Sequence, residues 1–244
     1  MAKSTVAEIR ARFDADVERF SSLETGQEAA VGGLQAMGLI AEAAAAATPG
    51  ARRLLDVGCG AGNYALKFLA AQPAGGSPVD VTLVDLSAPM LERAAERVSA
   101  ATRGTVETVQ ADVRDVKRLT GSADVILAAA VLHHLRDDAE WDAVFGKFAA
   151  WLAPGGSAWV FDMVDSPIPA VAALQRARWG EHLAALKGGG EAGAAYREAV
   201  FEYVEQEDTP RPLAWQLERM RAAGFRAVDV LLADRGFAAF GGVA

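Results

Sequence analysis

Apolar residues gather along this chain into short runs that alternate with stretches of helical period. Runs typical of β-strands fall at residues 53–57, 79–85, 106–110, 124–128, 157–163, 225–232 and 235–241. Most of the segments between them carry apolar side chains at helical spacing, which predicts a helix between one strand and the next. This alternation is typical of an α/β fold with a mostly parallel sheet.

Two helical regions stand outside this alternation. At the N-terminus, helices are predicted over residues 4–20, with Ser4 as the cap, and over 29–47, with a break at 21–27. After the fifth strand, helices are predicted over 170–187 and 191–206, joined by three glycines. We expect a single domain with an N-terminal helical cap (1–50), a core (51–165), a helical lid (166–210) and a C-terminal helix with strands (211–244).

The stretch from residue 54 to 64 reads as a strand, a glycine turn and the start of a helix. It contains the pattern D-x-G-x-G-x-G, formed by Asp56, Gly58, Gly60 and Gly62. Glycines let the backbone turn sharply and let a ligand approach closely. A turn of this kind between a parallel strand and a helix is where open α/β sheets bind nucleotides.

The acid in this pattern indicates which nucleotide is bound. The dinucleotide fingerprint G-x-G-x-x-G is not matched, because Gly62 comes one residue early. A pyrophosphate seeks backbone N–H groups and a helix N-terminus, whereas Asp56 places a carboxylate beside the turn. S-adenosylmethionine carries an ammonium and a sulfonium and no phosphate, so it suits this acid. The single cysteine, Cys59, is interpreted as a small filler of the turn.

On these residues the chain resembles the class I S-adenosylmethionine-dependent methyltransferases, whose first motif has this acid-and-glycine form. D-L-S-x-x-M-L at 85–91, L-x-P-G-G before the fifth strand and A-G-F after the last helix are similar to later motifs of that family. The resemblance implies a Rossmann-like, seven-stranded, mostly parallel sheet with helices on both faces and an antiparallel last strand. The N-terminal helices and the lid are then expected to close over the carboxyl edge of the sheet.

Acidic residues at the ends of three successive predicted strands form the centre of the expected cofactor site. Asp85 follows the glycine turn by roughly 20 residues, the separation at which an acid reaches both ribose hydroxyls. Met90 is expected to lie against the adenine face. The resemblance implies that Asp112 accepts from the adenine amino group and that Val113 supplies a backbone donor. The expected cofactor-binding residues are Asp56, Gly58, Cys59, Gly60, Asn63, Tyr64, Asp85, Leu86, Met90, Asp112, Val113 and Ala129.

The end of the fourth strand excludes two kinds of methyltransferase and offers candidate bases. Residues 128–130 are alanines, whereas enzymes acting on exocyclic amines of nucleic acids have Asn or Asp with Pro-Pro and an aromatic here, and magnesium-dependent catechol enzymes have an acid. His133 and His134 follow, and imidazole is the natural base near neutral pH. The alternative is a histidine that packs over the cofactor or bonds to a loop. Neither the histidines nor Cys59 have the spacing of a metal site, so no metal is expected.

Arg197 is the third candidate for a role in catalysis. It lies off the apolar stripe of its predicted helix among Glu198, Glu202 and Glu205. One interpretation is a solvated arginine that pairs with those acids. The other is recognition of a carboxylate, because the lid of carboxy-S-adenosylmethionine synthases holds an arginine in a comparable place.

The composition of the chain limits the kinds of partner that the protein is expected to bind. The chain has 244 residues, a formal net charge of −8 and one cysteine. The acidic balance argues against broad binding of nucleic acid, and no apolar run approaches the length of a membrane helix. With one cysteine and no apolar leader, a cytoplasmic protein that does not act at a membrane is expected.

The predicted function is transfer of a methyl group from S-adenosylmethionine to a small-molecule nucleophile, with S-adenosylhomocysteine as product. The nucleophile is anionic if Arg197 recognises a carboxylate. One alternative is an enzyme like carboxy-S-adenosylmethionine synthase or one that modifies the wobble uridine of tRNA. A second is a non-catalytic S-adenosylmethionine-binding module. The sequence names neither the acceptor nor the oligomeric state.

Overall fold

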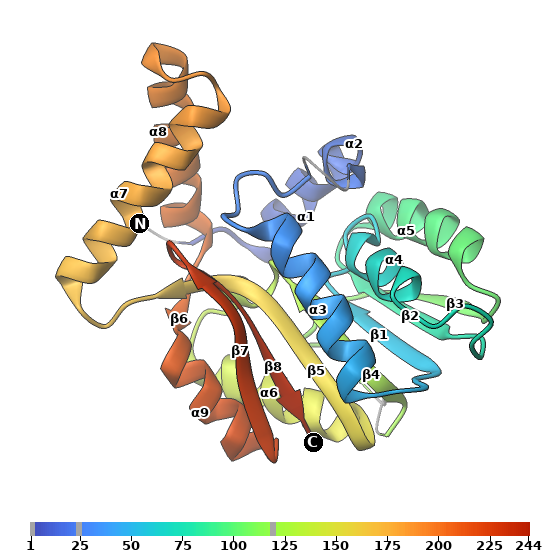
Figure 1. Ribbon diagram of the computed structural model, residues 1–244. Coiled ribbons are helices and arrows are strands. Elements are labelled where there is room, and N and C mark those ends of the chain that lie inside the picture. The colour runs from blue at the N-terminus through green and yellow to red at the C-terminus, as the bar shows by residue number, and fades with distance from the viewer. Residues whose placement is uncertain (1–2, 23–25, 118–120) are drawn as a thin grey trace.

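A computed structural model describes residues 3–22, 26–117 and 121–244. Its main sheet has the strand order β3-β2-β1-β4-β5-β8-β7. A two-residue strand, β6 (Arg211–Pro212), pairs with the end of β5 and was not predicted. The expected α/β sheet is confirmed, and it contains the seven predicted strands with β6 as a short eighth (Figure 1). The seven strands are β1 (Arg53–Val57), β2 (Asp80–Asp85), β3 (Val106–Gln110), β4 (Ala123–Ala129), β5 (Leu152–Asp165), β7 (Ala227–Asp234) and β8 (Phe237–Val243).

Strand direction also follows the expectation. β1 pairs in parallel with β2 and β4, β2 with β3, and β4 with β5. β8 is antiparallel to both β5 and β7. The parallel strands therefore end together at one edge of the sheet, and that edge is where ligands bind in such folds.

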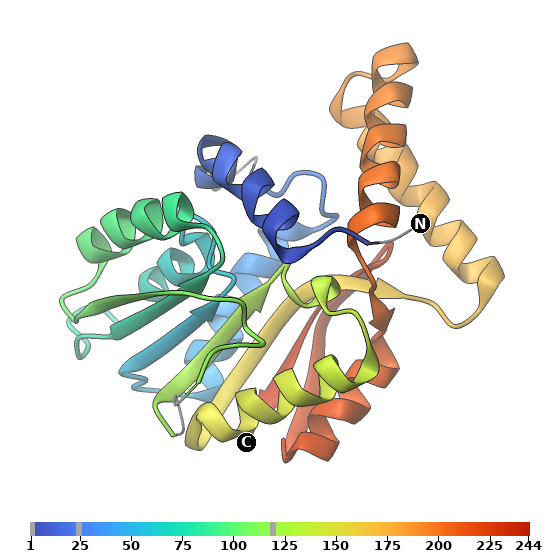
Figure 2. The same cartoon turned by 180° about the vertical axis from the view of Figure 1, so that it is seen from behind.

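Helices cover both faces of the sheet. α3 (Gly33–Ala47), α4 (Asn63–Ala70) and α5 (Ala88–Ala101) pack on one face in one hydrophobic cluster, in front of the sheet in Figure 1. α6 (Asp138–Trp151) and α9 (Leu213–Ala223) pack on the other face, which Figure 2 brings to the front. The central strands are buried on both faces, which explains why β1 and β4 read as continuous apolar runs.

The first predicted helix is interrupted in the structure. It forms α1 (Val6–Ala15) and α2 (Val17–Ser21). At the junction Asp16 leaves the helical conformation, its backbone N–H bonds to Phe13 O, and its carboxylate pairs with Arg19 at 2.6 Å. The predicted cap is also wrong by one residue, because Thr5 forms a capping box with Glu8. Of the predicted break at 21–27, residues 23–25 lie outside the described residues.

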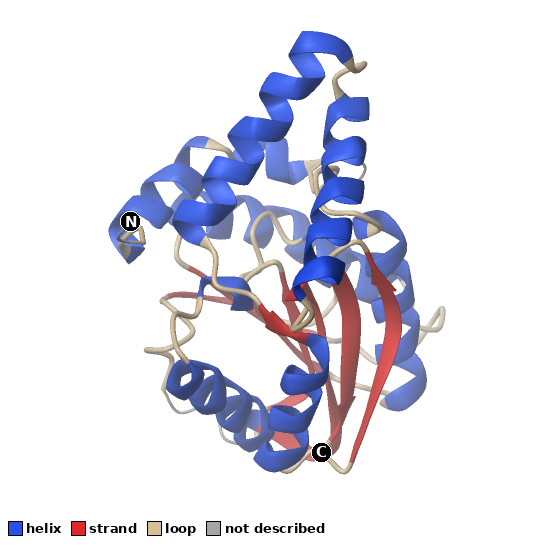
Figure 3. Ribbon diagram, turned by 90° about the vertical axis from the view of Figure 1, so that its left-hand side faces the viewer, coloured by secondary structure: helices blue, strands red, loops and turns tan. Residues whose placement is uncertain are grey.

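The region predicted as a lid forms a helical hairpin. α7 (Pro169–Leu186) and α8 (Gly190–Glu207) rise from the edge of the sheet, as Figures 1 and 3 show. Gly188, Gly189 and Gly190 all have positive φ at the outer turn. Trp179, near the middle of α7, fastens the hairpin to the body, because its indole N–H donates to Ala29 O at 2.8 Å.

Candidate functional site

A pocket opens at the carboxyl ends of β1, β2 and β4. All twelve residues expected to bind the cofactor lie on its wall, and so does His134. His133 and Arg197 do not line it. The sequence did not identify several further wall residues: Phe13, Phe20, Gln27, Arg114, Val131 and Leu135.

The three glycines of the turn have different functions. All have positive φ. A Cβ on Gly58 would lie 2.6 Å from Val131 Cγ2, and one on Gly62 would lie 3.0 Å from Val98 Cγ2. A Cβ on Gly60 would meet nothing within 4 Å, so this glycine alone leaves the backbone open to the pocket. Burial raises the pKa of the Cys59 thiol, which fits a filler rather than a nucleophile.

Asp56 places a buried carboxylate at the start of the turn. Its side chain accepts from the backbone N–H of Ala65 at 3.2 Å and is 1% exposed. Burial, with a smaller contribution from Asp85, raises the pKa of Asp56 to about 7. A buried carboxylate that accepts one hydrogen bond from the described residues is stabilised by a cationic ligand.

Asp85 holds the turn from the neighbouring strand. Its carboxylate accepts from Gly60 N at 2.8 Å and from Ser87 N at 2.9 Å. Burial raises the pKa of Asp85, and these backbone hydrogen bonds oppose the rise. The acid therefore shapes the glycine turn in addition to lining the pocket, a function that spacing alone does not reveal.

Asp112 forms an ion pair with Arg114, a residue that the sequence did not single out. Arg114 donates from Nε and Nη2 to the two carboxylate oxygens of Asp112, at 2.8 and 2.6 Å, and also pairs with Glu140. Burial alone would raise the pKa of Asp112, but the hydrogen bonds from Arg114 lower it overall. The carboxylate is thus held charged and in a fixed orientation on the pocket wall.

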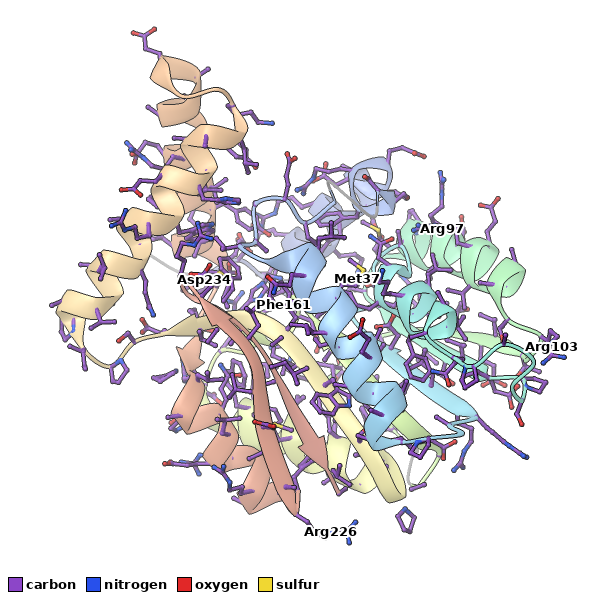
Figure 4. The ribbon with its side chains drawn as sticks, in the orientation of Figure 1. Met37, Arg97, Arg103, Phe161, Arg226 and Asp234 are labelled. Atoms are coloured by element: carbon purple, nitrogen blue, oxygen red, sulfur yellow. The ribbon has the colours of Figure 1, made fainter. Side chains whose placement is uncertain are left out.

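Asn63 fastens the N-terminal helices to the glycine turn. Its amide donates to Phe20 O at 2.9 Å and to Ser22 O at 3.3 Å. Arg97 of α5, labelled in Figure 4, donates to the Asn63 oxygen at 2.8 Å and to Ala61 O at 2.6 Å. The wall residues of α1 and α2 are placed beside the cofactor residues by these contacts.

His133 is buried behind the pocket in an ion pair. Its Nδ1 bonds to Asp162 Oδ1, and its Nε2 lies 3.7 Å from Asp208 Oδ1. Burial alone would lower the pKa of His133, but the two carboxylates raise it to about 9. At neutral pH this imidazole is therefore charged, and it is not available as a base.

The pKa of His134 is shifted in the opposite direction from that of His133. His134 lines the pocket, and its ring lies 6.1 Å from the Phe13 ring. Burial, together with the charge on His133, lowers the pKa of His134 although Asp208 opposes the shift. A neutral imidazole on the pocket wall can accept a proton.

The two histidines and Asp208 also form a group that could hold a metal ion. The candidate ligand atoms of His133, His134 and Asp208 lie within 4.8 Å of one another. Asp162 already holds His133 Nδ1, and pairing of the imidazoles with Asp208 accounts for the closeness of the three side chains. We therefore assign no metal to this group.

Arg197 is not brought to the pocket. It lies on α8, its side chain packs over Gly180 of α7, and its guanidinium donates to Glu198 at 2.8 and 3.0 Å. This arrangement matches the interpretation of Arg197 as a solvated arginine that pairs with an acid of its own helix. The prediction that Arg197 recognises an anion gains no support from this arrangement.

Across the described part of the chain, no helix is both long and apolar enough to cross a membrane.

Comparison with known sequences identifies related enzymes. A family described as a methyltransferase domain matches residues 55–158. The 27-O-demethylrifamycin SV methyltransferase of Amycolatopsis mediterranei is 33% identical over 181 residues, which cover 71% of this chain and 63% of that enzyme. The ubiquinone/menaquinone biosynthesis C-methyltransferase UbiE of Syntrophotalea carbinolica is 30% identical over 183 residues, 75% of this chain and 72% of that enzyme. The chain thus spans less than two thirds of the length of the rifamycin enzyme.

Solved structures share the fold. An O-methyltransferase family protein from Burkholderia thailandensis superposes with a TM-score of 0.64 at 21% identity, covering 98% of this chain and 61% of that one. Human N-acetylserotonin methyltransferase, solved with SAM, gives a TM-score of 0.60 at 16% identity, covering 99% of this chain and 62% of that one. At these identities the likeness concerns the fold.

Proposed function

Because this chain belongs to the class I S-adenosylmethionine-dependent methyltransferases, we propose that it transfers a methyl group to a hydroxyl of a small, largely apolar acceptor. The observation that carries this proposal is the position of the His134 imidazole on the same pocket wall as the cofactor residues. Burial and the charge on His133 lower the pKa of this imidazole.

The pocket fits S-adenosylmethionine on three observations. The buried Asp56 carboxylate suits an ammonium or sulfonium. The Tyr64 hydroxyl is buried, lines the pocket and has no hydrogen-bond partner among the described residues, so it is free to bond to a ligand. Gly60 leaves open space where a side chain would stand. We assign the methionine end to these residues, the ribose to Asp85 and the adenine to Met90, Asp112 and Val113.

Methyl transfer requires few chemical groups from the protein. When bound, S-adenosylmethionine supplies a methyl group that its sulfonium already activates. The chain must align an acceptor, exclude water and take up one proton. His134 accepts that proton as the acceptor hydroxyl becomes the new ether oxygen, and the N-terminal helices cover the site.

The acceptor is inferred from the wall near His134. Phe13, Phe20, Val131 and Leu135 contribute apolar surface to it. Such a wall favours an apolar or aromatic molecule with one protic group. Arg197 faces away from this wall and pairs with Glu198, so we do not propose an anionic acceptor or carboxy-S-adenosylmethionine chemistry.

Binding and transfer are tested separately. Calorimetry is expected to detect S-adenosylmethionine binding, and methyl-labelled cofactor is expected to label phenols or alcohols from a panel that also contains amines and thiols. His134→Gln should lower turnover by about 10²–10⁴-fold and leave cofactor affinity unchanged. The matched control is His182→Gln, which removes a histidine of the lid whose Nε2 contacts Glu28 O.

Each alternative predicts a different result. Binding without transfer to any compound of the panel would favour a non-catalytic binding module. Transfer to amines alone would reject the hydroxyl acceptor. Normal turnover of His134→Gln would remove the proposed base. We also propose a cytoplasmic location, which rests on the single cysteine.

A further inference from the structure

The end of the lid is fastened to the segment that carries the histidines. Asp208 follows α8 directly and caps its last turn through a bond to Val204 O at 2.9 Å. The next residue, Thr209, donates from its backbone N–H to His133 O at 2.7 Å and from its hydroxyl to Leu135 O. These bonds fix the backbone on either side of Asp208 relative to His134.

Two buried polar atoms face each other across this junction. Asp208 Oδ1 lies 3.1 Å from His134 Nδ1. Their alignment lies outside hydrogen-bond geometry, and neither atom has another hydrogen-bond partner among the described residues. Asp208 is 5% exposed, so bulk water has little access to its carboxylate. A small rotation of either side chain makes the hydrogen bond, whereas leaving both atoms unpaired is costly.

We propose that Asp208 is a positioning residue that keeps the proton of His134 on Nδ1, so that Nε2, which is buried and has no hydrogen-bond partner among the described residues, is the nitrogen that accepts a proton from the methyl acceptor. This inference rests on the proposed function of His134 as the base. A carboxylate on one imidazole nitrogen fixes which nitrogen is the acceptor. The lid would then contribute a part of the proton-accepting machinery from more than 70 residues along the chain.

The surrounding charges favour this pairing over the competing one. His133 Nε2 is farther from Asp208 Oδ1, at 3.7 Å, and His133 Nδ1 is already held by Asp162. Lys3 of the N-terminal segment donates to the backbone oxygen of Asp208 rather than to its carboxylate.

Two other charged or titratable groups stand near this cluster. Tyr203 of α8 is neutral at physiological pH, because burial and the Asp208 carboxylate raise its pKa to about 12. Arg136 lies near enough to lower the pKa of His133, but its guanidinium bonds to the backbone oxygens of Glu207 and Ser4. Among the groups that face His134, Asp208 is therefore the one placed to hold its Nδ1 proton.

The tautomer can be read without an acceptor. The chain contains three histidines, so an untagged protein labelled with ¹⁵N-histidine gives three imidazole spin systems, which His182→Gln and His133→Gln assign by subtraction. Near pH 7.5 we expect His134 as the Nδ1–H tautomer and His133 as the doubly protonated ring. In Asp208→Asn we expect His134 to lose its single tautomer and its titration to move to lower pH. Asp208→Glu should restore the wild-type pattern.

The matched control is Glu205→Gln, which removes an exposed acid of the same helix that pairs with Arg176. It should leave all three imidazoles unchanged. An Nε2–H tautomer of His134 in the wild type would overturn the inference even if the Asp208 variants failed to fold, and so would an unchanged spectrum in Asp208→Asn. A change of these signals on treatment with EDTA would overturn it in favour of a metal ion. S-adenosylmethionine affinity, measured on the same samples, should be the same for the wild type and every variant. If the wild type does not bind the cofactor, the proposed function is rejected, but the tautomer of His134 is still determined.

Discussion

The side-chain amide of Asn63 donates a hydrogen bond to the backbone oxygen of Phe20 across a distance of 2.9 Å. Asn63 is the first residue of α4 and follows the glycine turn directly, whereas Phe20 belongs to α2. Phe20 and Phe13 supply the aromatic wall of the pocket. The position of the N-terminal helices over the site therefore depends on a residue of the cofactor loop.

Asn63→Ala should loosen these helices. The variant removes the bonds to Phe20 and Ser22 and leaves Arg97 with one partner fewer, which should cost about 1–3 kcal/mol. Amide hydrogen exchange over residues 6–21 is expected to accelerate, while that of the central strands stays slow. Gln72→Ala is the control, because Gln72 lies just beyond the other end of α4 and its side-chain amide donates to Phe68 O. Unchanged exchange over 6–21 would show that other contacts hold the helices.

Asp85→Ala should weaken S-adenosylmethionine binding by about 1.5–3 kcal/mol, because charge-assisted hydrogen bonds to the ribose are lost. The hydrogen bond to Gly60 N is lost as well, so the glycine turn should also become less ordered. Calorimetry measures the affinity, and Glu92→Ala, an exposed acid on the following helix, should bind like the wild type. Equal affinity of Asp85→Ala and the wild type would reject the ribose assignment.

Gly60→Val should abolish cofactor binding and leave most of the fold intact. The new side chain meets no protein atom within 4 Å of its Cβ, so it enters the pocket, at the cost of a positive φ of 49°. Gly188→Val at the outer turn of the hairpin is a matched control, since it has a φ of 76° and equally open space but lies outside the pocket. Thermal unfolding should shift similarly in both variants, and only Gly60→Val should lose binding. Retained binding would show that this part of the turn does not face the ligand.

The sequence was sufficient to predict which residues lie at the strand ends. Asp56, Asp85 and Asp112 each follow or end a short apolar strand, and parallel topology brings such positions to one edge. The expected cofactor residues consequently meet on one pocket wall. The glycine spacing could be interpreted because Gly58, Gly60 and Gly62 each have a positive φ, a backbone conformation that favours glycine.

The sequence was not sufficient where contacts span long separations. Asp208 reaches His134 only because the end of α8 is fastened to the histidine segment, and no periodicity indicates this. Arg114 lies two residues after Asp112, but nothing local shows that its guanidinium turns back onto that carboxylate. The break at Asp16 was missed for a different reason, because the apolar stripe continues past a junction that local hydrogen bonds set.

The raised pKa of Asp56 makes cofactor binding depend on pH. Burial shifts this pKa to about 7, so the empty pocket favours the protonated acid below that value. A cationic ligand binds the carboxylate form and must displace the proton. Affinity should therefore fall as the pH drops below 7, and binding near pH 7 should release a fraction of a proton.

We expect S-adenosylmethionine to bind about tenfold more weakly at pH 6.0 than at pH 7.5, a window in which the ligand's own α-amino group stays largely charged. Calorimetry in buffers of different ionisation enthalpy measures both the affinity and the released proton. Asp56→Asn keeps the shape of the side chain without its titration, so it should bind weakly with an affinity that changes little over this range. A wild-type affinity that is flat between pH 6.0 and 7.5 would mean that Asp56 stays charged in the empty pocket, and the cation would then have to be recognised by a carboxylate that is already ionised.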